Sequence, residues 1–141
     1  MDKKIISTEK APQAIGPYSQ AIVANGFLFT SGMVPIDPAT NQLVEGDITV
    51  QAKQAISNLK NLIEASGSSC DKVVKTTVFI KDMNQFSIIN DIYKEYSMNC
   101  EKSSLVSKCL HLHNDLSCQT LRYGFCVLIT IKYLDCADSM L

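Results

Sequence analysis

The stretch "AIVANGFLFT", residues 21–30, decides the first element of the fold. Asn25 and Gly26 lie between two short apolar runs, and a two-residue type I′ turn needs positive φ at both central positions. Asn-Gly meets that need readily, so the stretch predicts a β-hairpin. The next segment, residues 31–47, has two prolines and two glycines, and we expect a loop that wraps back toward the sheet.

Beyond this loop, apolar residues recur at helical spacing from about Thr49. They are Ala52, Ala55, Ile56, Leu59, Leu62 and Ile63. Gly67 stands where a residue in the left-handed conformation would end the helix. The spacing therefore predicts an amphipathic helix between Thr49 and Gly67.

A strand and a second helix are predicted next. Residues 72–82, "KVVKTTVFIKD", are rich in β-branched side chains and bounded by polar ones, which is typical of a strand in the middle of a sheet. Asp82 or Asn84 can cap the following helix. Its expected apolar stripe consists of Phe86, Ile89, Tyr93 and Tyr96. Residues 126–134, "CVLITIKYL", are expected to form the last strand.

The order hairpin, helix, strand, helix predicts an α+β fold in which two helices pack on one face of a small sheet. A chain of 141 residues with 46% hydrophobic composition can form one domain with a substantial core. The formal net charge is −1, from 13 basic and 14 acidic residues, so no strong field attracts nucleic acid or an anionic membrane.

Residues 1–10 lack the apolar centre of a signal peptide, and the apolar run of residues 125–131 is too short to cross a bilayer. We therefore expect a cytoplasmic protein without nucleic-acid or membrane partners. In a reducing compartment its six cysteines are expected to be free thiols.

Five of the six cysteines, both histidines and the only arginine follow Tyr96. Four of these residues, in the pattern C-x-H-x-H-x-x-x-x-C, are Cys109, His111, His113 and Cys118. Four converging ligands are what zinc requires, but this spacing matches no standard zinc module. We interpret the array as incidental and predict no metal site.

Four motifs occur in order and at consistent spacing. They are "APQAIGPYSQA" (11–21), "TSGMVP" (30–35), "VVKTTVFIKDMNQF" (73–86) and "IINDIYKEY" (88–96). Together they closely resemble the Rid family of reactive-intermediate imine deaminases, also called YjgF proteins. The resemblance implies a chorismate-mutase-like domain over residues 1–97 that assembles as a homotrimer, with an active site in each cleft between subunits.

The resemblance also implies a reaction. In the family, a small 2-imino or 2-aminoacrylate acid is hydrolysed to a 2-keto acid and ammonium, without cofactor or metal. Such a reaction needs a cation that holds the carboxylate, a group that positions and deprotonates water, and groups that orient the nitrogen. Arginine suits the first task because its planar fork binds a carboxylate through two hydrogen bonds.

Four residues of this chain match pocket positions of the family. The resemblance assigns Ser31 to hydrogen bonding near the reacting nitrogen or water, and Tyr18 and Asn90 to shaping the pocket. It assigns Gly32 to close approach of the substrate. Taken singly, the Tyr18 motif is better explained by packing in an ordinary Pro-containing turn. Ser31 and Gly32 could form a turn after a strand, and Asn90 could be a solvated helix residue. Asn90, however, lies four residues after Phe86 and three before Tyr93, which suggests the apolar side of the helix.

Residues 98–141 depart from the family pattern. The family continues into a strand of the type Pro-Ala-Arg-Ser-Cys and a last strand with glutamates, whereas this chain has "CEKSSLVSKC" and no glutamate after Glu101. Lys102, Lys108 and Arg122 are the candidate substitutes for the carboxylate-binding arginine.

The change has two explanations, a divergent functional ending or a change of reading frame near Met98. The alternative function is a noncatalytic module that binds a small metabolite or a protein partner on the same trimeric scaffold.

Overall fold

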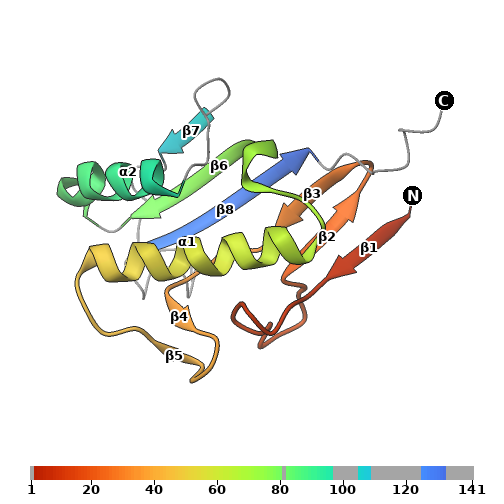
Figure 1. Cartoon of the computed structure of the whole chain (residues 1–141), viewed down its shortest axis with the longest axis horizontal. Coiled ribbons are helices and arrows are strands. Elements are labelled where there is room, and N and C mark those ends of the chain that lie inside the picture. The colour runs from red at the N-terminus through yellow and green to blue at the C-terminus, as the bar shows by residue number, and fades with distance from the viewer. Residues whose placement is uncertain (1, 81, 97–104, 109–124, 133–141) are drawn as a thin grey trace.

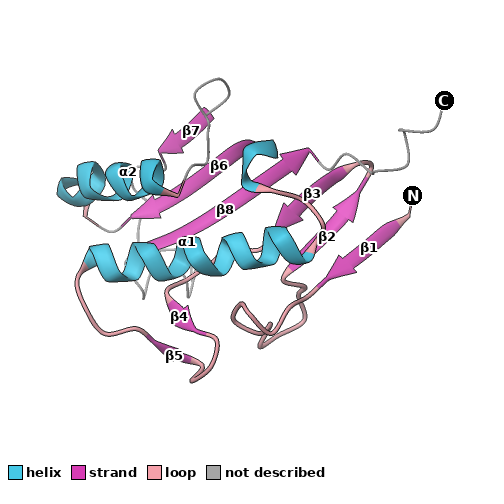
Figure 2. Ribbon diagram, in the orientation of Figure 1, coloured by secondary structure: helices cyan, strands magenta, loops and turns pink. Residues whose placement is uncertain are grey.

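The structure of the protein is a computed structural model, which describes residues 2–80, 82–96, 105–108 and 125–132. It contains a six-stranded mixed sheet in the order β1-β2-β3-β8-β6-β7. The strands are β1 (Lys3–Ile6), β2 (Ala21–Ala24), β3 (Phe27–Thr30), β6 (Val73–Ile80), β7 (Leu105–Lys108) and β8 (Phe125–Lys132). The described helices α1 (Ile48–Ala65) and α2 (Phe86–Glu95) both lie in front of this sheet (Figures 1 and 2), as expected for the α+β fold.

The hairpin at the start of the sheet is confirmed. Strands β2 and β3 pair antiparallel, and only Asn25 and Gly26 separate them. Both turn residues have positive φ, 52° and 72°, as a type I′ turn requires. Strand β1, which the sequence did not predict, pairs with the outer side of β2 and forms one edge of the sheet.

The segment between β3 and α1 is a loop with a small ribbon in it. Strands β4 (Ile36–Asp37) and β5 (Gln42–Leu43) pair antiparallel, and Asn41 has a φ of 57° in the turn between them. Asn58 anchors this segment to α1, because its Nδ2 donates to the carbonyl oxygens of Val34 and Ile36 at 3.2 and 2.7 Å. The loop was predicted, but two-residue strands leave no periodic signal in a sequence.

Helix α1 confirms the amphipathic helix that the spacing of apolar residues predicted. Asp47 is its N-cap, since the carboxylate Oδ1 accepts a hydrogen bond from the Val50 amide at 3.0 Å. The helix ends at Ala65 with Ser66 as its C-cap, and Gly67 follows with a φ of 83°. Its buried residues form much of the core: Ile48, Ala52, Ala55, Ile56, Asn58, Leu59, Leu62 and Ile63.

Strand β6 lies inside the sheet, as predicted, because β8 pairs with it antiparallel on one side and β7 parallel on the other. Asp82 then caps a short 3₁₀ turn, η2 (Met83–Gln85), by accepting from the Asn84 amide at 3.0 Å. Helix α2 continues from this turn. Its apolar side differs slightly from the predicted stripe, because Ile92 is buried together with Ile89.

The last predicted strand is confirmed as β8, which begins one residue earlier than expected and ends two residues earlier. It lies between β3 and β6 and joins the two halves of the sheet. Strand β7, which the sequence did not predict, ends at Lys108, whose backbone is in register with Val78. The remaining tail features lie outside the described residues: Lys102, Arg122 and the array of Cys109, His111, His113 and Cys118.

Cross-strand pairing divides the strand residues between two faces of the sheet. Ile6, Ala21 and Thr30 stand in one row and are buried in the core. Ile5 and Phe29 stand in the neighbouring row and point to the opposite side, where they are 68% and 42% exposed. We call this side the open face, defined by Ile5, Phe27, Phe29 and Lys75.

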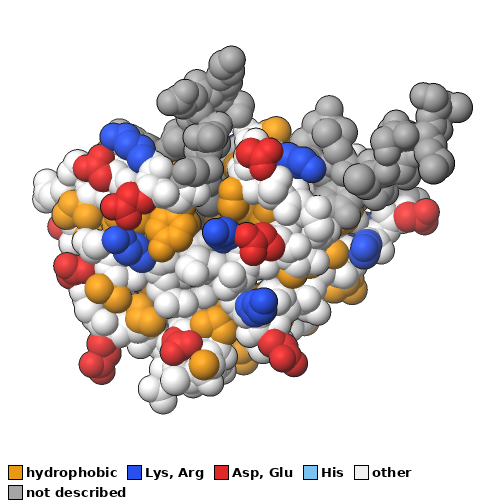
Figure 3. All heavy atoms as spheres, viewed as in Figure 1, with side chains coloured by type: hydrophobic (Ala, Val, Ile, Leu, Met, Phe, Trp, Pro, Cys, Tyr) orange, Lys and Arg blue, Asp and Glu red, His pale blue; other side chains and the backbone are white. Residues whose placement is uncertain are grey.

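The helix side of the molecule is charged but balanced. Lysines and acidic residues are interspersed over it (Figure 3), and Lys53 and Glu95 join α1 to α2 through an ion pair of 3.3 Å. Exposed pairs of this kind contribute little to stability. Among the residues described, no helix combines the length and the apolar character needed to span a membrane.

Candidate functional site

Ser31 is held at the end of β3 by two hydrogen bonds. Its amide donates to the carbonyl oxygen of Gln20 at 2.9 Å, and its Oγ donates to the carbonyl oxygen of Ser19 at 2.6 Å. A serine hydroxyl has one hydrogen to donate and two lone pairs that accept. With the hydrogen directed at Ser19, the half-buried Oγ is oriented to accept a hydrogen bond from a ligand N–H or from water.

Tyr18 directly precedes Ser19, whose carbonyl oxygen accepts the hydrogen bond from the Ser31 hydroxyl. The Tyr18 amide donates to the Gly16 carbonyl oxygen at 2.8 Å, and its phenol oxygen accepts a long bond of 3.4 Å from the Ile15 amide. A side chain at Gly16 would contact the ring at about 3.4 Å, so the ring lies against this glycine. The ring is nevertheless 54% exposed and available to a ligand.

Gly32 follows Ser31 and precedes the buried Met33. Positive φ occurs at Gly26, Gly46 and Gly67 among the described glycines, and Gly32 is not one of them. Its backbone conformation is therefore accessible to other residues. The assignment of Gly32 to close approach of a substrate stays a prediction.

Asn90 is not on the apolar side of α2, contrary to the expectation from its spacing. It is exposed, whereas Ile89 and Ile92 are buried. Successive residues of a helix are about 100° apart, so a buried face that includes positions 89 and 92 turns position 90 outward. Within the part of the chain that the structure describes, no hydrogen bond joins Asn90 to Tyr18 or Ser31, and its pocket role stays a prediction.

Two further polar residues, which the sequence did not single out, lie directly before β2 and on β6. Gln20 is 3% exposed and holds the segment before β2, and Lys75 is an exposed cation on the open face of β6. Lys75 is in register with Thr130 of β8, which is in register with Phe29. The signal for Gln20 was a large amide directly before an apolar strand, but its partners lie too far along the chain to be inferred.

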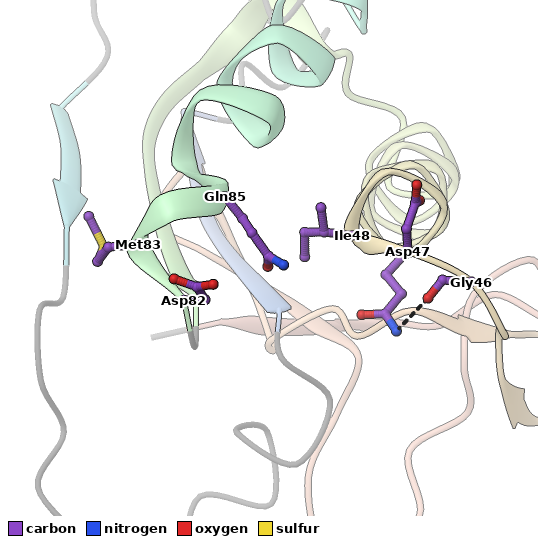
Figure 4. A pocket seen from close by; sticks show the side chains of 7 residues that line it. Gly46, Asp47, Ile48, Asp82, Met83 and Gln85 are labelled. Carbon is purple, nitrogen blue, oxygen red and sulfur yellow. Dashed lines mark hydrogen bonds between the residues drawn. The ribbon is translucent and has the colours of Figure 1, made fainter.

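A separate hollow of about 510 Å³ lies between the start of α1 and the η2 turn (Figure 4). Its described lining is Gly46, Asp47, Ile48, Gln51, Asp82, Met83 and Gln85. Both carboxylates are engaged as caps, and Gln51 Nε2 donates to the Gly46 carbonyl oxygen at 3.5 Å. Tyr18, Ser31 and Gly32 do not line it, so the hollow is distinct from the site at the end of β3.

Comparisons with known proteins show the family of this chain. Residues 8–116 match the family described as Endoribonuclease L-PSP. A RutC family protein from Pyrococcus abyssi is 51% identical over 96 residues, which are 68% of this chain and 76% of the relative. The 2-iminobutanoate/2-iminopropanoate deaminase of Mus musculus is 50% identical over 94 residues, 67% of this chain and 70% of the relative.

A solved structure extends the likeness to the fold. The conserved Rid family protein YyfA from Yersinia pestis, of unknown function, superposes with a TM-score of 0.75 at 35% identity, over 93% of this chain and 99% of that one. The four sequence motifs, between residues 11 and 96, lie within the matched range. The chain therefore belongs to the Endoribonuclease L-PSP family, also known as the Rid or YjgF family.

Proposed function

We propose that this protein hydrolyses small 2-imino acids, or their enamine tautomers, to 2-keto acids and ammonium. The observation that carries the proposal is Ser31, whose amide and hydroxyl are both held by hydrogen bonds, to Gln20 and Ser19 respectively. Ser31 is next in sequence to Gly32, and Ser19 is next in sequence to the exposed Tyr18. The name of the mouse relative, 2-iminobutanoate/2-iminopropanoate deaminase, supports the substrate class.

In this reaction, water adds to the carbon of the C=N bond, and the nitrogen then leaves as ammonia while a C=O bond forms. Ser31 Oγ donates its hydrogen to the Ser19 carbonyl oxygen, so its lone pairs accept a hydrogen bond from the N–H of the substrate or from the attacking water. Tyr18 bounds the pocket, and Gly32 lets the planar substrate approach the backbone. Such positioning accelerates a reaction because the reacting groups no longer have to find each other in solution.

The substrate carboxylate requires a cation. Lys102, Lys108 and Arg122 remain the candidates from the sequence. Lys75, an exposed cation on the open face, is a further candidate to bind the carboxylate. A lysine supplies a point charge without the two-pronged geometry of arginine. We therefore expect weaker discrimination among carboxylates than an arginine would give.

The proposal includes assembly as a homotrimer in the cytoplasm. The open face supports it, because Ile5, Phe27 and Phe29 are large apolar residues exposed on one side of the sheet. The rings of Phe27 and Phe29 lie side by side, with centroids 6.3 Å apart. An apolar surface of this kind is typical of a protein interface, and further copies of the chain would cover it.

The test is hydrolysis of 2-iminobutanoate and 2-iminopropanoate, generated in place by a threonine or serine dehydratase. We expect the protein to accelerate release of the keto acid and the Ser31→Ala variant to lose about 10²-fold of that rate. Ser87→Ala, an exposed serine on α2, is the matched control and should keep the parent rate.

A folded protein that does not accelerate the reaction contradicts the proposal. The noncatalytic binding module then becomes the better explanation, and titration calorimetry with 2-oxobutanoate would detect it. Equal activity of the parent and Ser31→Ala would instead remove Ser31 from the reaction and leave the substrate class in place.

A further inference from the structure

We infer that Gln20 is a positioning residue that fixes Tyr18 and Ser31 in one geometry, an inference that rests on the proposed function. Gln20 touches no reacting group in this arrangement. It acts through the backbone of the two segments that carry those residues.

The carboxamide of Gln20 binds back to the first half of the loop that joins β1 to β2, residues 7–20, which contains Tyr18. Its Oε1 accepts from the Thr8 amide at 2.6 Å. Its Nε2 faces three carbonyl oxygens, those of Thr8 at 3.0 Å, Ala11 at 3.2 Å and Pro12 at 2.8 Å. The bond to Pro12 joins the start of the loop to its end, and Tyr18 lies between these two points.

The backbone of the same residue reaches the reaction site from the other side. The Gln20 carbonyl oxygen accepts from the Ser31 amide at 2.9 Å, and the neighbouring Ser19 carbonyl oxygen accepts from the Ser31 hydroxyl at 2.6 Å. A displacement of residues 19 and 20 would therefore move both acceptors on which the orientation of Ser31 depends.

Burial makes this arrangement stiff. Gln20 is 3% exposed and Ala11 is fully buried, so the hydrogen bond between them is shielded from competing water, and the bonds to Thr8 and Pro12 are partly buried. Removing the carboxamide would leave the Thr8 amide and several carbonyl oxygens without this partner, and the loop would have to move to reach water. Displacements of about 1 Å at a reactive group reduce rates by about 10²-fold.

The same chain offers a matched control. Asn61 also binds this loop, because its Nδ2 donates to the Lys10 carbonyl oxygen at 2.8 Å, but that bond is exposed and does not involve residues 19, 20 or 31. If Gln20 only held the loop against the body of the protein, loss of the Asn61 bond would resemble loss of the Gln20 bonds. If Gln20 positions Ser31, the two variants will differ in catalysis per folded molecule.

The experiment compares Gln20→Leu, Asn61→Ala and the parent. We expect kcat of Gln20→Leu, corrected for the folded fraction by circular dichroism, to fall about 10- to 100-fold, while KM changes by less than about threefold. We expect the Ser31 amide to exchange with deuterium at least about tenfold faster in Gln20→Leu. Asn61→Ala should match the parent in both measurements.

Gln20→Glu supplies a conservative variant whose effect can be reversed. Above its pKa, the new carboxylate would place one oxygen against the carbonyl oxygens of Thr8, Ala11 and Pro12. The other charged groups on this loop are Glu9 and Lys10, which are both exposed. Burial and this repulsion favour the protonated acid, which can again donate to a carbonyl oxygen. The activity of Gln20→Glu relative to the parent should therefore rise as the pH falls from about 8 to about 5.

A folded Gln20→Leu with parental kcat and parental protection of the Ser31 amide would overturn the inference. So would a Gln20→Glu variant whose activity relative to the parent does not depend on pH. A parent without imine hydrolysis overturns the proposed function instead. In that case, deuterium exchange at Ser31 still decides whether Gln20 holds this residue.

Discussion

The two faces of the sheet differ sharply although the same short strands build them. On β1, Ile6 is 5% exposed and its neighbour Ile5 is 68% exposed; on β3, Leu28 is fully buried and Phe29 is 42% exposed. Side chains alternate across a strand, so each strand supplies both faces. The covered face and the helices stabilise one copy of the chain, whereas the apolar open face gains its full benefit only when another molecule covers it.

The largest effect is expected on the covered face. Leu28→Ala removes a fully buried side chain of β3 from the core and should lower the free energy of unfolding by about 2–5 kcal/mol. Urea unfolding followed by circular dichroism measures this, at one protein concentration for all variants because assembly also affects stability.

Phe29→Ala, one residue further along β3, is the matched comparison. At concentrations where single copies prevail, it should cost clearly less than Leu28→Ala, because its ring is already partly exposed. Equal losses of unfolding free energy for the two variants would mean that the open face stabilises a single copy of the chain as much as the covered face does.

The open face should instead control association. Phe29→Glu places a charge on the open face, which also carries Ile5 and Phe27. Burial of this face by further copies of the chain then becomes unfavourable. We expect sedimentation to show a trimer for the parent and single copies for the variant, with helical content unchanged. Glu45→Gln, at an exposed position outside the sheet, is the control and should sediment like the parent. A variant that keeps the trimer would show that the copies meet through another surface.

Local signals explain what the sequence predicted. The hairpin, α1 and β6 each depend on residues within one segment: a turn pair, a helical period and a run of β-branched side chains. The strands β1, β4, β5 and β7 have two to four residues and no period to detect. The position of β8 between β3 and β6 depends on pairing between distant segments, which no local pattern specifies.

The candidate site was predicted less completely than the fold. The resemblance supplied Tyr18, Ser31 and Gly32, and the structure brings their backbones together through Ser19 and Gln20. The bonds of Gln20 span eight to twelve residues, so its role could be seen only in three dimensions. Asn90 was assigned to the wrong side of α2 because two of its neighbours, rather than the whole buried set, were used to orient the helix.

A smaller effect is expected at the start of α1, which covers the sheet. Asp47→Ala removes the acceptor of the Val50 amide and should cost about 1 kcal/mol of unfolding free energy. Asp47→Ser, which keeps a capping oxygen, should recover most of this loss. If Asp47→Ser is as destabilised as Asp47→Ala, the carboxylate acts through charge and not as a cap.

The smallest effect is expected in the η1 turn, Cys70–Lys72, which contains no buried residue and belongs to neither face. A hydrogen bond from the Ser69 side chain, aided by the backbone and Lys72, holds the pKa of Asp71 below its ordinary value of 3.8. A lowered folded-state pKa means that the native state favours the carboxylate. The resulting stability is present above the unfolded-state pKa and is lost as the pH falls through the folded-state pKa.

Ser69→Ala should therefore have a slightly lower urea midpoint than the parent at pH 7, and this difference should disappear as the pH falls from about 5 to about 2. In an Asp71→Asn background, Ser69→Ala should show no pH-dependent difference, because the titrating group is gone. A difference that grows in acid would mean that Ser69 stabilises the protonated acid and that the sign is reversed. Because Asp71 is exposed to solvent, even the full effect stays far below that of Leu28→Ala, so burial against the helices outweighs surface charge in this fold.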